Sequence, residues 1–241
     1  MSDSSTGNQA DWQSEFPITQ RWPATHPDRI QLYSYPTPNG VKASIALEEL
    51  GLPYEVQRVT ISDVDVKSPE FLSLNPNNKI PAIIDPNGPD GRPIGLFESG
   101  AILTYLADKA GKLIGSTASQ RYEILQWVFF QVGGIGPMVG QLGFFFAFAG
   151  KDVEDPRPVE RYANETRRLL NVVDQQLQDR EWIAGDYSIA DIAVAPWLSS
   201  IAKFYKAEEI TQLNSFKNVL DFLERFNARP AVAKGWTIPP R

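Results

Sequence analysis

The sequence predicts an α/β domain in the N-terminal part of the chain and an all-α domain in the C-terminal part. Short strand-like runs alternate with helical spacing before residue 111, whereas helical periodicity without a convincing strand continues after residue 118. The 241 residues are enough for a substantial core, in one large domain or in two small ones.

The α/β domain is predicted to begin with a βαβ unit. Residues 30–35 alternate and are rich in strand-forming types, residues 41–50 have helical spacing and end at Gly51, and residues 54–59 form a second strand. A unit of this kind joins two parallel strands.

A hairpin and a helix are predicted to complete this domain. Residues 80–85 and 94–97 predict two strands around a turn rich in proline, glycine and aspartate. Residues 98–110 follow as a helix that stops at Gly111. The order βαβ–ββα is typical of a thioredoxin-like fold.

The C-terminal part predicts four helices, over residues 121–132, 157–179, 188–204 and 216–228. Ser188 and Asp191 predict a capping box at the start of the third helix. Residues 133–137 hold three glycines and a proline, so we expect a break there that kinks a helix or widens a groove.

We therefore divide the chain into an N-terminal extension at residues 1–28, a thioredoxin-like domain at 29–111 and an all-helical domain at 119–236. The extension is rich in Ser, Asp, Gln and Pro, which is typical of a tail or an extended arm. Its large aromatic residues, Trp12, Phe16 and Trp22, indicate that the arm packs on the body of the protein or on a partner subunit.

Composition excludes several kinds of chemistry. The chain has no cysteine, which excludes structural disulfides, thiolate zinc sites and a cysteine nucleophile. The single histidine, His26, cannot form a two-histidine metal site, and we expect no metal. If the protein carries out thiol chemistry, the thiol must therefore come from a ligand.

Charge and hydropathy also limit the partners. The net charge of −6 disfavours nucleic-acid binding and docking to anionic membranes. No uninterrupted apolar run reaches the length of a membrane span, and the polar first twenty residues lack the apolar core of a secretory signal. We expect a cytoplasmic protein.

Two segments predict a binding site for a small anionic peptide. Glu98 and Ser99 are expected in the first turn of a helix, where unpaired N–H groups and the helix dipole attract a carboxylate or phosphate. The Ile80–Pro81 step places an extended backbone with free peptide groups beside it. The plain alternative is a hairpin that leads into an N-capped helix.

Three sequence strings resemble the thioredoxin-like half of cytosolic glutathione transferases: NPNNKIPAI, FESGAILTYLADK and YSYPTPNGVKASIALEELGLPYE. The PTPNG variant is similar to the nu-class and Ure2-like branch of that family. The strings LQWVFFQVGGIGPMVGQ, WIAGDYSIADIAVAPW and RFNARPAVAKG extend the resemblance over roughly Gln31 to Trp236. It implies a glutathione transferase architecture with glutathione as cosubstrate.

The resemblance also implies which residues bind the sulfur of glutathione. Thr37 and Asn39, in the turn between the first strand and the first helix, would contact it and stabilise the thiolate, which is the nucleophile. Tyr33 and Tyr35 compete as donors, but in a strand they point to the same face, toward the core, and rank lower. Ser34 is a further candidate.

The two ends of the tripeptide are assigned by the same resemblance. Lys79 would pair with the glycyl carboxylate, although it could also be an exposed turn lysine, and Ile80 would bind the cysteinyl backbone beside a cis Pro81. Glu98 would receive the γ-glutamyl ammonium, and Ser99 would hold the γ-glutamyl carboxylate.

The helical half is expected to supply a second site. Trp127, Gln131 and Tyr162 are candidates for a second-substrate pocket, and Arg161 matches a stretch that in nu-class relatives helps to hold a second glutathione. Core packing is the alternative for most aromatic residues in this half, including residues 144–148.

The nu-class resemblance implies a glutathione-dependent disulfide-bond reductase, with peroxidase activity as a possible addition and small disulfides, peroxides or electrophiles as substrates. One alternative is a conventional transferase that conjugates hydrophobic electrophiles. Another is a non-catalytic regulatory protein of the Ure2 type, against which the short polar extension argues. The family further implies a homodimer.

Overall fold

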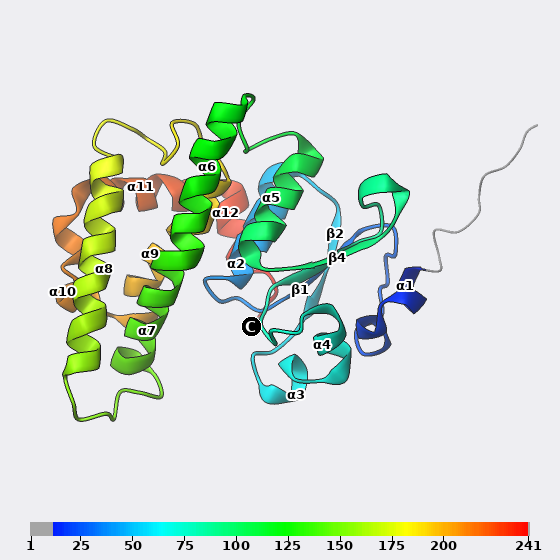
Figure 1. Cartoon of the computed structure of the whole chain (residues 1–241), viewed down its shortest axis with the longest axis horizontal. Coiled ribbons are helices and arrows are strands. Elements are labelled where there is room, and N and C mark those ends of the chain that lie inside the picture. Colours follow the sequence, from blue (N-terminus) through cyan, green and yellow to red (C-terminus); the bar gives the residue numbers. More distant parts are fainter. Residues whose placement is uncertain (1–11, 241) are drawn as a thin grey trace, which may run out of the picture. The chain divides into compact units, whose positions relative to one another are not determined.

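The computed structural model describes residues 12–240, which form two compact units (Figure 1). The first unit comprises the described residues up to Leu106 together with residues from Lys234 onward, and the second comprises Ala107–Ala233. The first unit holds a four-stranded sheet and the second is helical, which confirms the predicted fold class.

The sheet of the first unit has the strand order β2-β1-β3-β4. Its strands are β1 (Ile30–Ser34), β2 (Tyr54–Arg58), β3 (Ala82–Asp85) and β4 (Ile94–Phe97). β1 and β2 are parallel and connected through α2 (Gly40–Leu50), whereas β3 pairs antiparallel with both β1 and β4. The predicted βαβ unit, the hairpin and the following helix α5 (Ser99–Ala110) are therefore present in the predicted order.

Different segments cover the two faces of this sheet. Figure 1 shows α2 and α5 on the same side of the sheet. On the other face, Tyr33, Ala82 and Ile84 pack in one cluster with residues of α4 (Pro69–Leu74). The sequence pattern did not predict α4 or the preceding α3 (Asp63–Val66), because helices of six and four residues are too short to show a helical period.

The N-terminal arm packs on the body of the first unit, which was one of its two predicted positions. It contains α1 (Trp12–Glu15) and the 3₁₀ turn η1 (Pro17–Gln20). Trp12 is buried and donates a 2.9 Å hydrogen bond from Nε1 to Pro27 O, while Phe16 and Trp22 pack against the same core cluster. The rest of the predicted extension, residues 1–11, lies outside the described residues.

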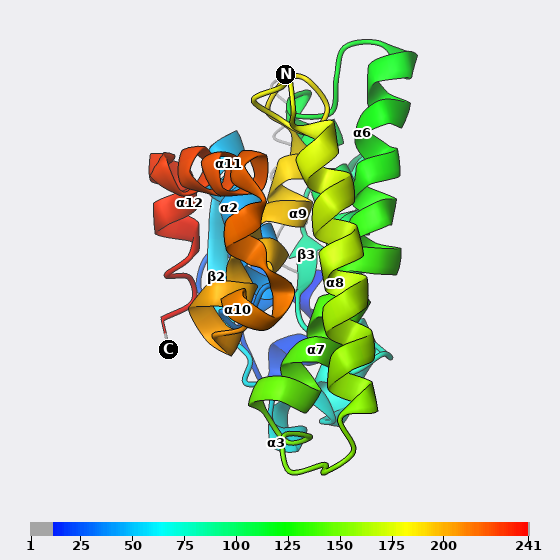
Figure 2. The ribbon, with the colours of Figure 1, turned by 90° about the vertical axis from the view of Figure 1, so that its left-hand side faces the viewer.

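The second unit is a bundle built around α9 (Ile189–Ser200), all of whose residues are buried. It contains α6 (Ala118–Phe130), α7 (Gly136–Ala147), α8 (Arg157–Gln176), α10 (Glu208–Thr211), α11 (Lys217–Ala228) and most of α12 (Pro230–Gly235). α9 contacts α6, α7 and α11, and Figure 2 shows α8 running beside α7. The four predicted helices correspond to α6, α8, α9 and α11.

The interruption of regular helix predicted at residues 133–137 is present, but it does not separate the chain into two detached helices. A π-helical turn, η3 (Gln131–Ile135), joins α6 to α7 directly. Pro137 lies in the first turn of α7, where a proline is tolerated. The glycines and the proline of this stretch predict an interruption, so the sequence does not predict α7.

The continuous helical stretch 118–147 is, by length and composition alone, apolar enough to cross a membrane, with a mean hydropathy of 1.3 over 18 residues. In this structure it contacts α8 and α9, and 39% of that window is buried. The apolar residues of this stretch thus contribute to the core of the helical unit.

The predicted capping box at the start of α9 is confirmed. The Ser188 N–H donates to Asp191 Oδ2 at 2.8 Å, and the Ile183 N–H donates to Asp191 Oδ1 at 2.9 Å. Asp191 is fully buried, and this burial raises its pKa to about 7, although the bonds from Ile183 and Ser188 favour the carboxylate. One side chain thus holds both the first turn of α9 and the preceding loop.

Candidate glutathione-binding site

The turn between β1 and α2 is held by Thr37. Its Oγ1 accepts a 3.2 Å hydrogen bond from the Gly40 N–H, and its carbonyl oxygen accepts one of 3.0 Å from the Val41 N–H. A Cβ atom at Gly40 would lie 1.9 Å from Tyr35 O, so only glycine fits where the chain enters the helix. Asn39 is the residue directly before α2.

Asn75 holds the segment before β3. Its Nδ2 donates to Lys79 O, and its Oδ1 accepts a 2.9 Å hydrogen bond from the Asn77 N–H. The Ile80–Pro81 peptide bond is cis, as predicted. These contacts fix the course of the backbone around Lys79 and Ile80.

The junction between β4 and α5 differs from the prediction in one respect. Glu98 has φ = +71° and lies directly before the helix, rather than within its first turn. Its carbonyl oxygen accepts the Ile102 N–H at 2.9 Å, and its side chain is exposed. A non-glycine residue in this backbone region is often found at a functional site. Ser99, the first residue of α5, is buried.

These three segments enclose a cavity of about 130 Å³. It is lined by Asn39, Asn75, Asn77, Lys79, Ile80, Pro81, Glu98 and Ser99. Five of the predicted site residues therefore meet at one place, although they come from three separate parts of the chain. The cavity has one cationic and one anionic side chain, Lys79 and Glu98, and can bind a zwitterionic ligand at two points.

A second cavity of about 590 Å³ shares three of these lining residues: Asn39, Lys79 and Ile80. It is also lined by Thr37, Ile61, Asp63, Val66, Lys67 and Asn78. Thr37 thus lines this cavity and not the smaller one. Since the two cavities share the Asn39 side, a ligand whose reactive group lies at Asn39 can extend into either.

The competing donors are placed as the strand geometry predicted. Tyr33 is buried in the core cluster and Tyr35 packs against the same cluster, so both point to one face of the sheet. Burial raises the pKa of Tyr33, with a smaller contribution from Glu55. Ser34 is buried, and its Oγ has no hydrogen-bond partner within residues 12–240. None of these three lines either cavity.

A functional candidate that the sequence analysis did not identify lies below the small cavity. Lys42 of α2 is 1% exposed, and its Nζ donates to Asn39 Oδ1 at 3.0 Å and to Ser99 Oγ at 3.2 Å. Burial lowers the pKa of Lys42 to about 7, although the nearby carboxylate of Glu98 acts in the opposite direction. Lys42 lies three residues before Ile45 and therefore falls on the apolar stripe of the predicted helix. A charged residue on such a stripe is unusual, and this is the sequence signal that could have identified Lys42.

Arg161 and Tyr162 line a cavity of about 420 Å³ within the helical unit, together with Phe145, Asp155, Arg157 and Pro158. Tyr162 stacks on Phe145 with ring centroids 5.8 Å apart. Arg161 and Tyr162 therefore lie beside the same cavity of this unit. Its role toward a second glutathione stays a prediction.

Trp127 and Gln131 do not line that cavity. Trp127 packs edge-on against Phe130 at 5.3 Å, and its Nε1 is buried without a hydrogen-bond partner in the described part of the chain. Gln131 is buried in the π-helical turn. A role of either residue in a second-substrate pocket stays a prediction.

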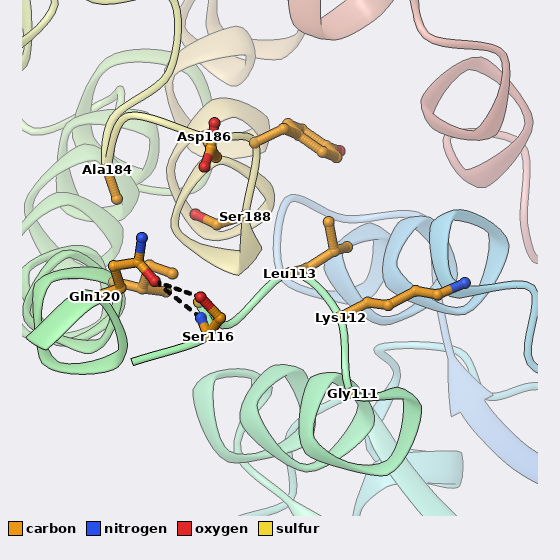
Figure 3. A pocket seen from close by; sticks show the side chains of 11 residues that line it. Gly111, Lys112, Leu113, Ser116, Gln120, Ala184, Asp186 and Ser188 are labelled. Atoms are coloured by element: carbon orange, nitrogen blue, oxygen red, sulfur yellow. Dashed lines mark hydrogen bonds between the residues drawn. The ribbon is translucent and has the colours of Figure 1, made fainter. Parts of the chain in front are cut away.

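Another cavity of the helical unit, of about 310 Å³, lies beside the start of α9 and contains none of the predicted site residues (Figure 3). Gln120 Oε1 accepts hydrogen bonds there from the N–H and Oγ of Ser116, and Asp186 and Ser188 lie across from it. Within residues 12–240, no group of three His, Cys, Asp or Glu side chains is arranged to hold a metal ion.

Family comparisons agree with both units. Residues 28–108 match the model of the glutathione S-transferase N-terminal domain, and residues 135–230 match that of the C-terminal domain. The chain is 42% identical over 207 residues to the disulfide-bond oxidoreductase YfcG of Escherichia coli strain K12, covering 85% of this chain and 93% of the relative.

Two solved structures are more similar still. A glutathione transferase from Burkholderia graminis, with two glutathione molecules bound per subunit, is 62% identical, with a TM-score of 0.93 and 95% of each chain covered. One from Pseudomonas putida, with one glutathione disulfide bound per subunit, is 57% identical, with a TM-score of 0.92 and coverage of 94% of this chain and 98% of that one. This chain therefore belongs to the glutathione S-transferase family and is an enzyme of that family.

Proposed function

We propose that this protein is a glutathione-dependent disulfide-bond reductase. The observation that supports this most directly is the meeting of Asn39, Lys79, Glu98 and Ser99 around one cavity. Glutathione carries a carboxylate at each end and an ammonium at the γ-glutamyl end. Lys79 suits the glycyl carboxylate, while Glu98 and Ser99 suit the ammonium and carboxylate of the other end. This arrangement directs the cysteinyl sulfur toward Asn39.

The chemistry is thiol–disulfide exchange. The thiolate of one bound glutathione attacks a sulfur of the substrate disulfide, which forms a mixed disulfide and releases one substrate thiolate. The thiolate of a second glutathione then attacks the glutathionyl sulfur, so that glutathione disulfide and a second substrate thiolate leave, and both substrate thiolates take up protons. Because the chain has no cysteine, both reducing sulfurs come from glutathione.

The protein's contribution is to stabilise the thiolate. A free thiol with a pKa near 8.5 is mostly protonated at neutral pH. Lowering that pKa by about two units requires about 2.7 kcal/mol. Hydrogen bonds to a charged group contribute about 1.5–3 kcal/mol each, so donors at the β1–α2 turn and the start of α2 supply the necessary order of magnitude.

The relatives support a disulfide-directed reaction over conjugation. YfcG is a disulfide-bond oxidoreductase by name, and the Burkholderia and Pseudomonas proteins contain two glutathiones and one glutathione disulfide, respectively. Two glutathiones and their disulfide are the reductant and the product of the exchange proposed here.

We also infer that the active form is a homodimer. Tyr122 and Phe129, each 71% exposed, are seven residues apart on α6 and therefore lie on one face of that helix. Two large exposed rings on one helix face are typical of an interaction surface. Light scattering at micromolar concentration should report twice the mass of the chain, and a monomer would contradict the inference.

Replacement of Asn39 tests the proposed function. Asn39→Ala should lower the reduction of bis-hydroxyethyl disulfide by glutathione about tenfold to a hundredfold, because one charge-assisted hydrogen bond to the thiolate is lost. Asn214→Ala, which replaces an exposed asparagine of the helical unit, is the control. Parent activity on an aryl halide that greatly exceeds its disulfide reduction would favour the conventional transferase. Unchanged disulfide reduction in Asn39→Ala would reject Asn39 as the sulfur ligand.

A further inference from the structure

A buried lysine joins the two halves of the candidate site. Lys42 Nζ lies within hydrogen-bond distance of Asn39 Oδ1 and of Ser99 Oγ, and its side chain is 1% exposed. Burying an ammonium group costs several kcal/mol, and a methionine of similar length could fill the same space without that cost. A lysine at this position therefore indicates a role in the site rather than in stability.

We propose that Lys42 is a positioning residue for glutathione: its ammonium group binds Asn39 and Ser99 as acceptors and thereby directs their donor groups to the cysteinyl sulfur and the γ-glutamyl carboxylate of one bound tripeptide. This inference rests on the proposed function, because it assigns the sulfur to Asn39 and the γ-glutamyl carboxylate to Ser99.

The donor chemistry of lysine supports this role. An ammonium group donates hydrogen bonds and accepts none. Asn39 therefore turns its carbonyl oxygen to Lys42, so the Nδ2 amide is the end of that side chain that can donate to another group. Ser99 Oγ likewise accepts from Lys42, so its hydroxyl hydrogen is directed elsewhere. Asn39 and Ser99 both line the small cavity, where the ligand supplies two anionic acceptors.

Charge couples the same contacts to proton binding. Burial lowers the pKa of Lys42 to about 7, and Glu98 is the charged neighbour that favours its ammonium form. Glu48, farther along α2, has other partners: Tyr54 Oη donates a 2.6 Å hydrogen bond to its Oε1, and Lys234 Nζ forms a 2.9 Å ion pair with its Oε2. A bound carboxylate and thiolate add negative charge above Lys42, so ligand binding raises its pKa and takes up a proton.

Calorimetry with S-methylglutathione measures this proton directly. The sulfur of this probe is a methyl thioether with no proton to lose, so proton uptake at about pH 7.5 reports on the protein. Titrations in buffers of different ionisation enthalpy should give an uptake of up to about one proton per site in the parent and none in Lys42→Met. Binding without proton uptake in the parent would overturn the proposal, and this measurement decides it even if the variant fails to fold.

The affinity for reduced glutathione provides the second readout. Lys42→Met should bind it about tenfold to a hundredfold more weakly, because the two donors lose their orientation. Lys217→Met, which replaces an exposed lysine of α11, is the matched control and should bind like the parent. The ratio of the parent's affinity for reduced glutathione to that of Lys42→Met should fall as the pH rises above about 7. Parent-like affinity of Lys42→Met at every pH would overturn the role of Lys42, whereas a parent that binds no glutathione would reject the proposed function itself.

Discussion

Lys42 Nζ lies 3.2 Å from Ser99 Oγ, although 57 residues separate the two in the sequence. The contact joins the beginning of α2 to the beginning of α5, below a cavity that the residues around both helix starts line. The β1–α2 turn and the β4–α5 junction are thus connected through a buried cation.

The buried lysine should make the stability of the first unit depend on pH. The pKa of Lys42 is lowered from its ordinary value of 10.5 to about 7 in the folded chain, so between these values the unfolded chain binds more protons. The free energy of unfolding of the parent, relative to that of Lys42→Met, should therefore rise with pH from about 7 to 10.5, by at most about 1.4 kcal/mol per pH unit. Below about pH 7 the cost of burying the charge is fully present, and Lys42→Met should be at least as stable as the parent.

Chemical denaturation of the parent and Lys42→Met across this range provides the measurement. The other titrating groups contribute equally to both proteins and cancel in the difference. A difference that does not change between about pH 6 and 9 would show that Lys42 keeps an ordinary pKa in the folded protein.

Thr37 should act first as a helix cap. Because its Oγ1 accepts the Gly40 N–H, Thr37→Ala should lower the free energy of unfolding by about 1 kcal/mol. Thr37→Ser keeps a hydroxyl acceptor and should retain most of the parent's stability. Denaturation and disulfide-reductase assays on both variants are the measurements. If Thr37→Ala lost activity at full stability, the hydroxyl would instead act directly on the sulfur.

The carboxylate of Glu98 should recognise the ammonium of the γ-glutamyl group. Glu98→Gln should weaken binding of glutathione about tenfold, since a charge-assisted hydrogen bond becomes a neutral one. An analogue that lacks the γ-glutamyl amino group should bind the parent and Glu98→Gln equally well. Calorimetry measures both affinities, and Glu224→Gln, at an exposed position of α11, is the control.

If Glu98→Gln weakened the binding of glutathione and of the analogue equally, the ammonium group of glutathione would bind elsewhere than at Glu98. Glu98 would then influence binding through its unusual backbone conformation, with φ = +71°, and not through its charge.

The sequence predicted those elements whose signals are local. The strands of the sheet alternate or form short apolar runs between turn residues, and α2 and α5 end at glycines that follow the last helical residue. α3 and α4 were missed because they are shorter than two helical turns. α7 was missed because Pro137 suggested a break, whereas a π-helical turn lets the helix continue around it.

The same distinction applies to the site. Asn39, Lys79, Ile80, Glu98 and Ser99 lie within the sequence strings that resemble glutathione transferases and were assigned from that resemblance. Lys42 and Asn75 were not, because their contacts become apparent only after the chain has folded. Lys42 reaches a residue 57 positions away, and Asn75 turns back to the carbonyl group of Lys79.

The capping box of α9 should be the position of the helical unit that is most sensitive to a polar substitution. Asp191→Ala leaves the buried N–H groups of Ile183 and Ser188 without their acceptor, and an unsatisfied buried donor costs about 1–3 kcal/mol. We expect Asp191→Ala to lower the free energy of unfolding by about 3 kcal/mol, and Ser188→Ala by about 1 kcal/mol. Asp221→Ala, at an exposed position of α11, should have little effect. Denaturation followed by helical circular dichroism measures all three. Equal stability of Asp191→Ala and Asp221→Ala would show that α9 begins without help from its cap and is held by the packing of its buried residues alone.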